Sequence, residues 1–272
     1  MQEDNFTPRP HAKFHSILMI LILTGIITLW LIYTPQGFLG KADAVGYAVC
    51  HRISERSLSI AGRQMPMCAR CTGMYLGAMI GLIYQFLRRP KHGRLPSHNI
   101  ILFMGILAFI WGVDGVNSYF HLFPSFNGIY EPNNVLRLLT GSGIGISAAI
   151  LLFPAFNQTF WQDWKTEPAI ETIQELLYLL CITLIIDGLV LLENPWILFP
   201  AAILSAIGTL FLLTMVYGMI WLIVVKRESY HLHISDAWIP LSIGLTIAIV
   251  QIGIMDWGRL WLTGTWSGLL FK

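Results

Sequence analysis

The chain has 272 residues, of which 55% are hydrophobic and 12% charged, and its mean hydropathy is +0.64. A soluble domain usually carries about twice that charged fraction. A formal net charge of +2 without a basic tail does not indicate a nucleic-acid partner, and four cysteines are too few for a disulfide scaffold in a chain of this length. The composition therefore predicts an all-α integral membrane protein.

Seven apolar runs are long enough to cross a bilayer core, which takes about 20 helical residues. They cover approximately residues 14–33, 71–87, 99–119, 135–153, 173–192, 196–225 and 237–254. We expect about seven transmembrane helices in one bundle, forming a single domain over residues 1–272. Three segments lie outside the spans: an N-terminal tail (1–13), a Cys- and Arg-rich loop (34–70) and an interfacial tail with three tryptophans (257–272). The first run lacks a cleavage site and is interpreted as a retained span rather than a signal peptide.

Glycines recur every four residues in two of these runs. The second run has Gly73, Gly77 and Gly81, and the fourth has Gly141 and Gly145. Residues four apart share one face of a helix, and a face without side chains lets another membrane helix approach closely. Both runs are expected to pack through these faces.

The distribution of lysine and arginine among the loops predicts the orientation of the chain. The short loops over residues 88–94 and 226–227 are basic. We therefore expect a protein of the cell membrane with these loops and the N-terminus on the cytoplasmic side. The Cys- and Arg-rich loop then lies on the outer face, although it carries Arg52, Arg56, Arg63 and Arg70. Two interpretations stay open: the loop is long and its charges are tolerated, or the arginines bind an anion.

The strongest chemical pattern lies between residues 50 and 81. Cys68-Ala-Arg-Cys71 can ligate one metal ion, and the adjacent Cys50 and His51 offer two further ligands for a tetrahedral zinc or iron site. Adjacent residues rarely reach one ion together, so one of Cys50 and His51 is also a candidate for a supporting position beside the ligands.

Two other interpretations fit the same cysteines. Cys71 starts a helix, where the helix dipole and the charge of Arg70 favour a thiolate, as in a redox-active thiol pair. Alternatively, a Cys68–Cys71 or Cys50–Cys68 disulfide, or a closed metal site, only staples the loop. Cys181 lies among leucines and isoleucines and is predicted to be a small core residue.

A second polar group lies inside the third and fourth runs. Asp114, Asn117 and His121 share one helix face by their spacing, and an acid at membrane depth is a candidate functional residue. A similar set opens the fourth run: Asn133, Asn134, Arg137 and Thr140. We expect Asp114 to pair with Arg137, either within a substrate site or as a structural clasp.

The predicted topology brings these groups to one surface. Asp187 in the fifth run is expected at the same outer end, whereas His231 and His233 form an exposed loop on the inner face. The set that should converge on the outer surface is Cys50, Cys68, Cys71, Asp114, Asn117, His121, Asn134, Arg137 and Asp187.

Four motifs resemble those of a known family. They read C-H-R-I-x-E-R-S, Q-M-P-x-C-A-R-C-T-G-M-Y-L-G, D-G-x-N-S and N-x-x-R-x-x-T-G. Together they resemble a prokaryotic polytopic membrane-protein family known only as domain of unknown function two thousand and eighty-five. The resemblance spans roughly residues 45–150. It implies a small polytopic membrane protein and brings no assigned activity.

Three functions fit these observations. The favoured one is a membrane enzyme that uses a zinc or iron ion on an anionic, lipid-like substrate, with Asp114 and Arg137 as catalytic residues. Its candidate substrate-binding residues are Arg70, Asn117, His121, Asn134 and Thr140. The alternatives are a membrane thiol–disulfide oxidoreductase and a protein without catalysis, either a transporter or a subunit of a larger membrane complex.

Overall fold

The computed structural model describes residues 10–123 and 128–267, so parts of the two predicted tails lie outside it. The described chain is almost entirely helical. Its long helices are α1 (Pro10–Tyr33), α3 (Ala69–Arg88), α4 (His98–Phe120), α5 (Asn134–Phe160), α6 (Ile173–Leu191), α7 (Pro195–Val224) and α8 (Ile234–Thr263). The shorter elements are α2 (Gly37–Val49), a 3-10 turn (Ser54–Arg56), β1 (Ser59–Ile60), β2 (Arg63–Gln64), β3 (His92–Arg94) and β4 (Lys165–Pro168).

Polar caps explain where several helices begin. Asn133 accepts a hydrogen bond from the backbone N–H of Leu136 at the start of α5, and Thr172 forms a capping box with Glu175 at the start of α6. Asn194 caps α7, whose first residue is Pro195. Such caps satisfy N–H groups that have no partner within the helix.

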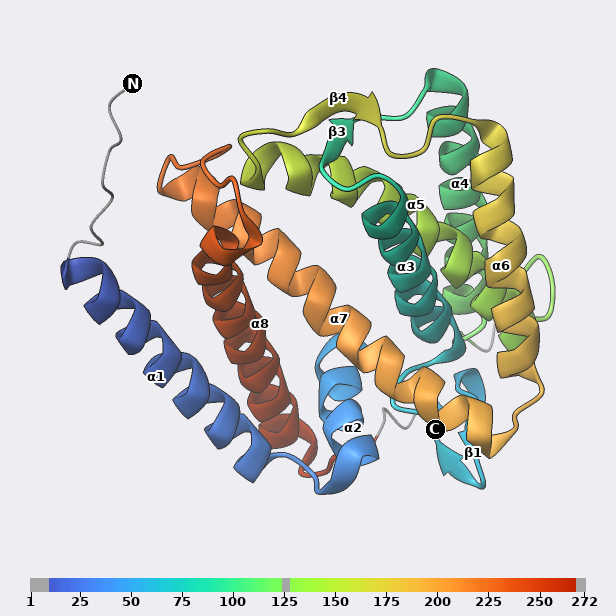
Figure 1. Ribbon diagram of the computed structural model, residues 1–272. Helices are drawn as coiled ribbons and strands as arrows, with labels where there is room; N and C mark the ends of the chain where they lie inside the picture. The colour runs from blue at the N-terminus through green and yellow to red at the C-terminus, as the bar shows by residue number, and fades with distance from the viewer. Residues whose placement is uncertain (1–9, 124–127, 268–272) are drawn as a thin grey trace.

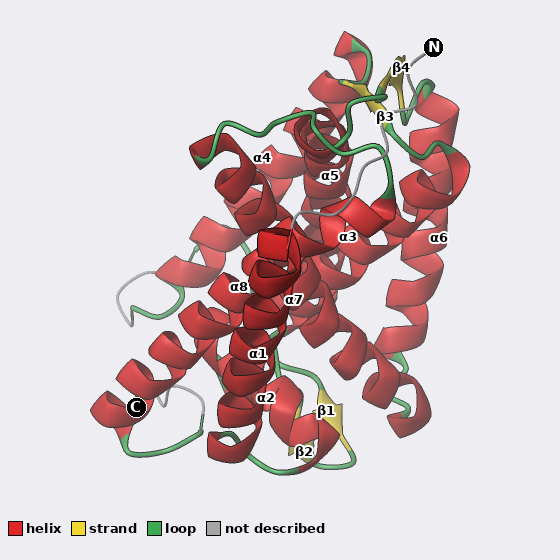
Figure 2. Cartoon of the chain, turned by 60° about the vertical axis from the view of Figure 1, so that its left-hand side comes forward, coloured by secondary structure: helices red, strands yellow, loops and turns green. Residues whose placement is uncertain are grey.

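The helices form two groups connected by α7. Figure 1 shows α1 and α8 side by side on one flank, α3 to α6 on the other, and the long α7 crossing between them. The antiparallel pair β1–β2 and the parallel pair β3–β4 lie at opposite ends of the bundle (Figure 2). We call these the β1–β2 end and the β3–β4 end.

The glycine faces of α3 and α5 pack against each other, as their spacing predicts. A Cβ atom built on Gly73 would lie 2.2 Å from the carbonyl oxygen of Leu138, and one on Gly145 would lie 2.1 Å from that of Met74. Gly81 faces Ala149 in the same way, further along both helices. Residue numbers therefore rise together along the contact, so α3 and α5 run parallel and both begin at the β1–β2 end.

The protein is a multi-pass membrane protein with fewer qualifying spans than predicted. Among the described residues five helices, α4 to α8, are long and apolar enough to cross a membrane, and α1 with α2 adds a sixth if this pair, bent by 102°, is one span. The predicted count of about seven is therefore not confirmed. Helix α3 is not among the qualifying helices; it carries Arg70, Gln85 and Arg88 as well as three glycines, all of which lower its mean hydropathy.

Two features of the C-terminal part differ from the sequence prediction: where the last helix ends and how exposed His231 is. Helix α8 continues through Trp257 and Trp261 to Thr263, so the predicted interfacial tail begins inside a helix, and these two tryptophans are exposed. The prediction of an exposed loop at residues 231 and 233 is half wrong. His231 is buried at the β3–β4 end, where its backbone bonds to Phe160 and Gln162, while His233 is exposed.

Candidate functional site

Three cysteine thiols meet at the β1–β2 end. Cys50 directly follows α2, Cys68 is the residue before α3, and Cys71 lies in the first turn of α3. Their sulfur atoms all lie within 4.8 Å of one another, and the thiols are not joined in a disulfide. Within the described residues, no other group of three or more Cys, His, Asp or Glu side chains has its possible ligand atoms this near to one another.

Backbone N–H groups and neighbouring thiols surround the sulfur of Cys50. The N–H of Cys68 lies 3.3 Å from it, and the N–H of Arg52 lies 3.5 Å from it. Arg52 has a φ of 51°, so a left-handed turn directs its N–H back to the sulfur. Hydrogen bonds from the Cys68 and Cys71 thiols lower the pKa of the Cys50 thiol well below its ordinary value. These contacts favour negative charge on this sulfur.

His51 does not join the three thiols. Its Nδ1 atom accepts a hydrogen bond from the backbone N–H of Ile53 at 3.0 Å, and no ring nitrogen belongs to the ligand cluster. Burial lowers the pKa of His51 below its ordinary value, so the ring is neutral at pH 7. The predicted set of four ligands therefore reduces to three thiols, with His51 beside them.

An arginine from the far end of the sequence holds the Cys50 segment in place. The guanidinium of Arg259, on α8, donates to the carbonyl oxygens of Tyr47 and Cys50 at 2.6 Å each, and to that of His51 at 3.0 Å. It also lies 4.1 Å from the centre of the Tyr47 ring. Arg259 is not among the residues predicted from the sequence, although a cation within an apolar helix is a signal for such a role.

The remainder of the cysteine loop is fixed by its own charges. Arg52, which is buried, pairs with Asp43 at 2.8 Å, and Arg63 pairs with the other oxygen of Asp43. Gln64 donates to the carbonyl oxygen of Arg52 at 2.8 Å. Two of the four loop arginines therefore hold the loop itself, and the side chains of the other two, Arg56 and Arg70, bond to α4.

The ionic partner of Asp114 is Arg70, so the predicted Asp114–Arg137 pair is wrong. The Asp114 side chain is 2% exposed and bonds to the guanidinium of Arg70, which stands between Cys68 and Cys71 at the start of α3. The hydroxyl of Tyr130 donates to the same carboxylate at 2.8 Å, and that of Thr140 does so at 3.4 Å. Arg137 instead donates to the side chain of Asn134 at 3.0 Å.

Two of the predicted substrate-binding residues hold the loop between α4 and α5. Asn117 donates to the carbonyl oxygen of Tyr130 at 2.8 Å and accepts from the N–H of Ile129 at 2.7 Å. A ring nitrogen of His121 lies 3.0 Å from the same carbonyl oxygen of Tyr130. This clamp places the Tyr130 hydroxyl on Asp114. Tyr130 was not selected from the sequence, because it lies in a loop without a repeating pattern.

Three arginines gather beside the thiols. Arg56 donates to the carbonyl oxygen of Ser118 at 2.7 Å, and Arg70 binds Asp114. Burial and the charge of Arg70 lower the pKa of Arg56. Arg137 is only 6% exposed, and its Nε has no hydrogen-bond partner within the described residues. We call Arg56, Arg70 and Arg137 the arginine cluster; Asp114 is the one acid that pairs with any of its members in the described structure.

The remaining predicted residues are placed as follows. Asp187 is buried and accepts a hydrogen bond from Ser142 at 2.8 Å, toward the bundle interior from the thiols. Asn134 also donates to the carbonyl oxygen of Glu55 at 3.4 Å. These contacts and those described above place the residues that were predicted to converge at the β1–β2 end, with Asp187 deeper in the bundle. Cys181 is exposed on α6, so its prediction as a core residue is wrong.

Comparison with known proteins identifies the family. Residues 50–151 match the family model described as "Predicted membrane protein (DUF2085)". An uncharacterized protein of Methanothermobacter thermautotrophicus is 38% identical over 103 residues, covering 38% of this chain and 83% of that protein. An uncharacterized protein of Methanocaldococcus jannaschii is 32% identical over 167 residues, covering 56% of this chain and 99% of that protein. No solved structure matches.

The matched segment contains the three thiols, the arginine cluster and Asp114, whereas Arg259 lies outside it. The resemblance seen in the cysteine motif is thus confirmed by the family model and by both archaeal relatives. This chain belongs to the family of predicted membrane proteins called DUF2085.

Proposed function

We propose that this protein is a membrane enzyme that holds a zinc ion, or an iron ion, on Cys50, Cys68 and Cys71 and acts on an anionic, lipid-like substrate. The observation that carries the proposal is three thiols within 4.8 Å of one another, beside three arginines and one carboxylate. Catalytic zinc sites have three protein ligands and an open fourth position, whereas four ligands make a structural site. The position of His51 outside the cluster supports the open form.

The donor set fits such an ion. Thiolates are soft ligands that select zinc and iron over magnesium and calcium, and zinc–sulfur bonds of about 2.3 Å put tetrahedral sulfurs roughly 3.8 Å apart. The three thiols reach that spacing with shifts of about 1 Å from their present limit of 4.8 Å. The start of α3 and the two N–H groups on Cys50 stabilise thiolate charge. When bound, the ion polarises a substrate oxygen or activates a water.

The arginine cluster supplies the binding site for the anion. Guanidinium groups bind phosphate oxygens in pairs, and Arg137 has a buried Nε without a partner among the described residues. Arg70 joins this cluster to Asp114, and Tyr130 and Thr140 hold the other contacts of that carboxylate. We assign substrate binding to Arg137 and Arg56. Asp114 orients Arg70 and is the candidate proton acceptor.

The orientation belongs to the same proposal. The β3–β4 end carries the basic segments 88–94 and 226–227, which the positive-inside rule assigns to the cytoplasm. The thiols and the arginine cluster then face the outer side, and the N-terminus is cytoplasmic. Reporter fusions to the N-terminus test this: cytoplasmic activity of the fused reporter supports the assignment, and extracytoplasmic activity reverses it.

The first experiment is elemental analysis of the purified protein with a count of free thiols. We expect about one equivalent of zinc or iron, lost in Cys68→Ser and Cys71→Ser and retained in Cys181→Ser, whose thiol is exposed on α6. Absence of metal, together with two thiols that appear only after reduction, would refute the metal site and favour the thiol–disulfide oxidoreductase. Absence of both would leave a transporter or a complex subunit as the better candidate.

The second experiment tests the anion. Wild-type protein and the Arg137→Gln and Arg56→Gln variants are titrated with vesicles that contain phosphatidic acid and with vesicles of neutral lipid only. We expect both variants to bind the acidic vesicles more weakly, while Arg94→Gln, at the exposed β3–β4 end, retains wild-type binding. Equal binding by all three variants would exclude a specific role for the arginine cluster.

A further inference from the structure

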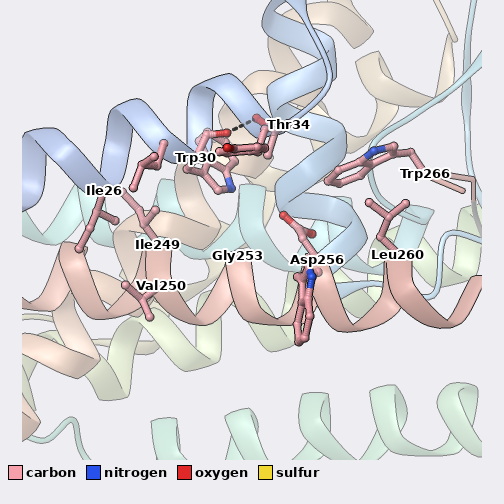
Figure 3. Close-up of a pocket in the computed structure, with 12 residues that line it drawn as sticks. Ile26, Trp30, Thr34, Ile249, Val250, Gly253, Asp256, Leu260 and Trp266 are labelled. Carbon is pink, nitrogen blue, oxygen red and sulfur yellow. Dashed lines mark hydrogen bonds between the residues drawn. The ribbon is translucent and has the colours of Figure 1, made fainter. Parts of the chain in front are cut away.

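A second pocket lies between α1 and α8, apart from the thiols. It has a volume of about 430 Å³, and its lining comes from residues 26–33 of α1, Thr34 just after it, residues 249–260 of α8, and Trp266. Most of these side chains are apolar or aromatic. Figure 3 shows Ile26, Ile249 and Val250 gathered at one side of the pocket, with Trp30, Asp256 and Trp266 at the other.

Asp256 is the one acidic side chain in this lining. It is 3% exposed, and neither of its carboxylate oxygens has a hydrogen-bond partner in the described structure. In Figure 3 the carboxylate projects from α8 into the space between Trp30 and Trp266. The indole N–H of Trp30 is buried beside this carboxylate and has no hydrogen bond of ordinary geometry in the described structure. A buried carboxylate without a partner costs several kcal/mol unless a cation or a proton neutralises it.

Arg259 and Arg52 lie near Asp256, but both are bonded to other groups. Arg259, on the same helix, donates to three backbone carbonyls and lies against the ring of Tyr47. Arg52 is bound to Asp43 and to the carbonyl oxygen of Trp266. Asp256 makes no ion pair with any residue that the structure describes. None of the residues that line the pocket is positively charged, so a cationic ligand can pair with the carboxylate.

The lining selects the type of cation. Calcium takes six to eight oxygen ligands and magnesium six, whereas this pocket offers one carboxylate, and the hydroxyl of Thr34 is already bonded to Trp30 and Lys41. Aromatic rings, by contrast, bind ammonium groups through their faces. The indoles of Trp30 and Trp266 on either side of a carboxylate are suited to an ammonium group.

We propose that the pocket between α1 and α8 binds a membrane amphiphile with an ammonium head group. The head lies at Asp256, between Trp30 and Trp266, and the hydrocarbon part follows Ile26 and Ile249. This site does not depend on the metal or on the anionic substrate. Lipid amines and soluble amines share the same head-group chemistry, and the length of the hydrocarbon part separates these two sources.

The test uses full-length protein in nanodiscs of neutral lipid, with empty nanodiscs as the blank. Binding of dodecyltrimethylammonium is measured by calorimetry and tryptophan fluorescence, and compared with dodecanol and with tetramethylammonium. We expect saturable binding of the long-chain cation, at least about tenfold tighter than that of the uncharged alcohol. Tighter binding than tetramethylammonium assigns the site to lipids, and equal binding assigns it to soluble amines.

Variants separate the site from general partition into the membrane. Asp256→Asn and Trp30→Leu are each expected to weaken the binding about tenfold or more. Asp187→Asn, which changes a buried acid already bonded to Ser142, is expected to bind like wild type. Unchanged binding in Asp256→Asn, or no preference of wild type for the cation over the alcohol, would overturn the proposal. The second comparison needs no variant, so it holds even if Asp256→Asn does not fold.

Discussion

A single methyl group on α5 should disturb both the bundle and the thiol cluster. In Gly141→Ala the new Cβ would lie 2.2 Å from the carbonyl oxygen of Arg70. That oxygen belongs to the backbone of α3 and cannot rotate away, so the two helices must separate by about 1 Å to reach an ordinary contact. Gly143→Ala is the matched control. Gly143 is buried on the same helix, but its added Cβ would meet only the side chain of Leu107 at 3.6 Å.

The magnitude follows from two opposing effects. Alanine is favoured over glycine in a helix by about 1 kcal/mol, and forced overpacking costs roughly 1–3 kcal/mol, occasionally more. We expect Gly143→Ala to be neutral or stabilising. The free energy of unfolding of Gly141→Ala should be lower than that of this control by about 2–4 kcal/mol. This difference is the helix preference of alanine, about 1 kcal/mol, added to the cost of overpacking, about 1–3 kcal/mol. Because Arg70 precedes Cys71, Gly141→Ala should also lose bound metal.

Reversible unfolding in mixed detergent measures the first effect, and elemental analysis of the folded fraction measures the second. Equal stability and equal metal content in the two variants would show that the close α3–α5 contact does not position the thiols. A loss of stability in Gly141→Ala without a loss of metal would separate the packing from the site.

Three further predictions concern the contacts at the β1–β2 end. A double-mutant cycle on the free energy of unfolding should give a coupling of about 1–3 kcal/mol between Asp114→Asn and Arg70→Gln. The coupling between Asp114→Asn and Arg137→Gln should be much smaller, because Arg137 bonds to Asn134. A larger coupling for the pair with Arg137 would contradict the observed pairing. Arg259→Gln removes three hydrogen bonds to the Cys50 segment, so zinc affinity measured by chelator competition should fall about tenfold, as for other contacts that orient metal ligands. Removal of metal by a chelator should lower the unfolding temperature of wild type, because binding energy adds to folding energy, and leave that of Cys68→Ser unchanged; an equal decrease in both would place the metal elsewhere.

Much of the fold could be predicted because bilayer helices leave strong local signals. Apolar runs of about 20 residues located the long helices, and four-residue glycine spacing identified the faces of α3 and α5 that pack together. The span count failed at α3 because its polar end and its glycines lower its hydropathy, although it is as long as a span. Cys181 was misplaced because lipid is as apolar as a protein core, so hydropathy cannot distinguish the two surroundings.

Pairings between helices could not be predicted from spacing along one helix. The spacing of Asp114 and Asn117 gave their shared face, but it contained no information on which neighbouring helix lies opposite. Arg70 was treated as an electrostatic companion of Cys71, yet the first turn of α3 directs its guanidinium toward α4 and the sulfur of Cys71 toward Cys50. Neighbouring positions on a helix point in different directions, so Arg70 bonds to Asp114 while the next residue, Cys71, joins the thiols.

Arg259 provides hydrogen-bond donors for backbone carbonyl groups that are left without partners where α2 ends. Between α2 and the turn at Arg52 the chain ends a helix, and the carbonyl groups of Tyr47, Cys50 and His51 need donors from elsewhere. One guanidinium with several donors in a fixed plane satisfies all three, and its cationic character also suits the Tyr47 ring. Those bonds come from the two Nη atoms of Arg259, whereas its Nε is buried without a hydrogen-bond partner in the described structure, as are both carboxylate oxygens of Asp256. The order of the thiol cluster thus depends on a side chain of α8 that lies 208 to 212 residues further along the chain than the segment it holds.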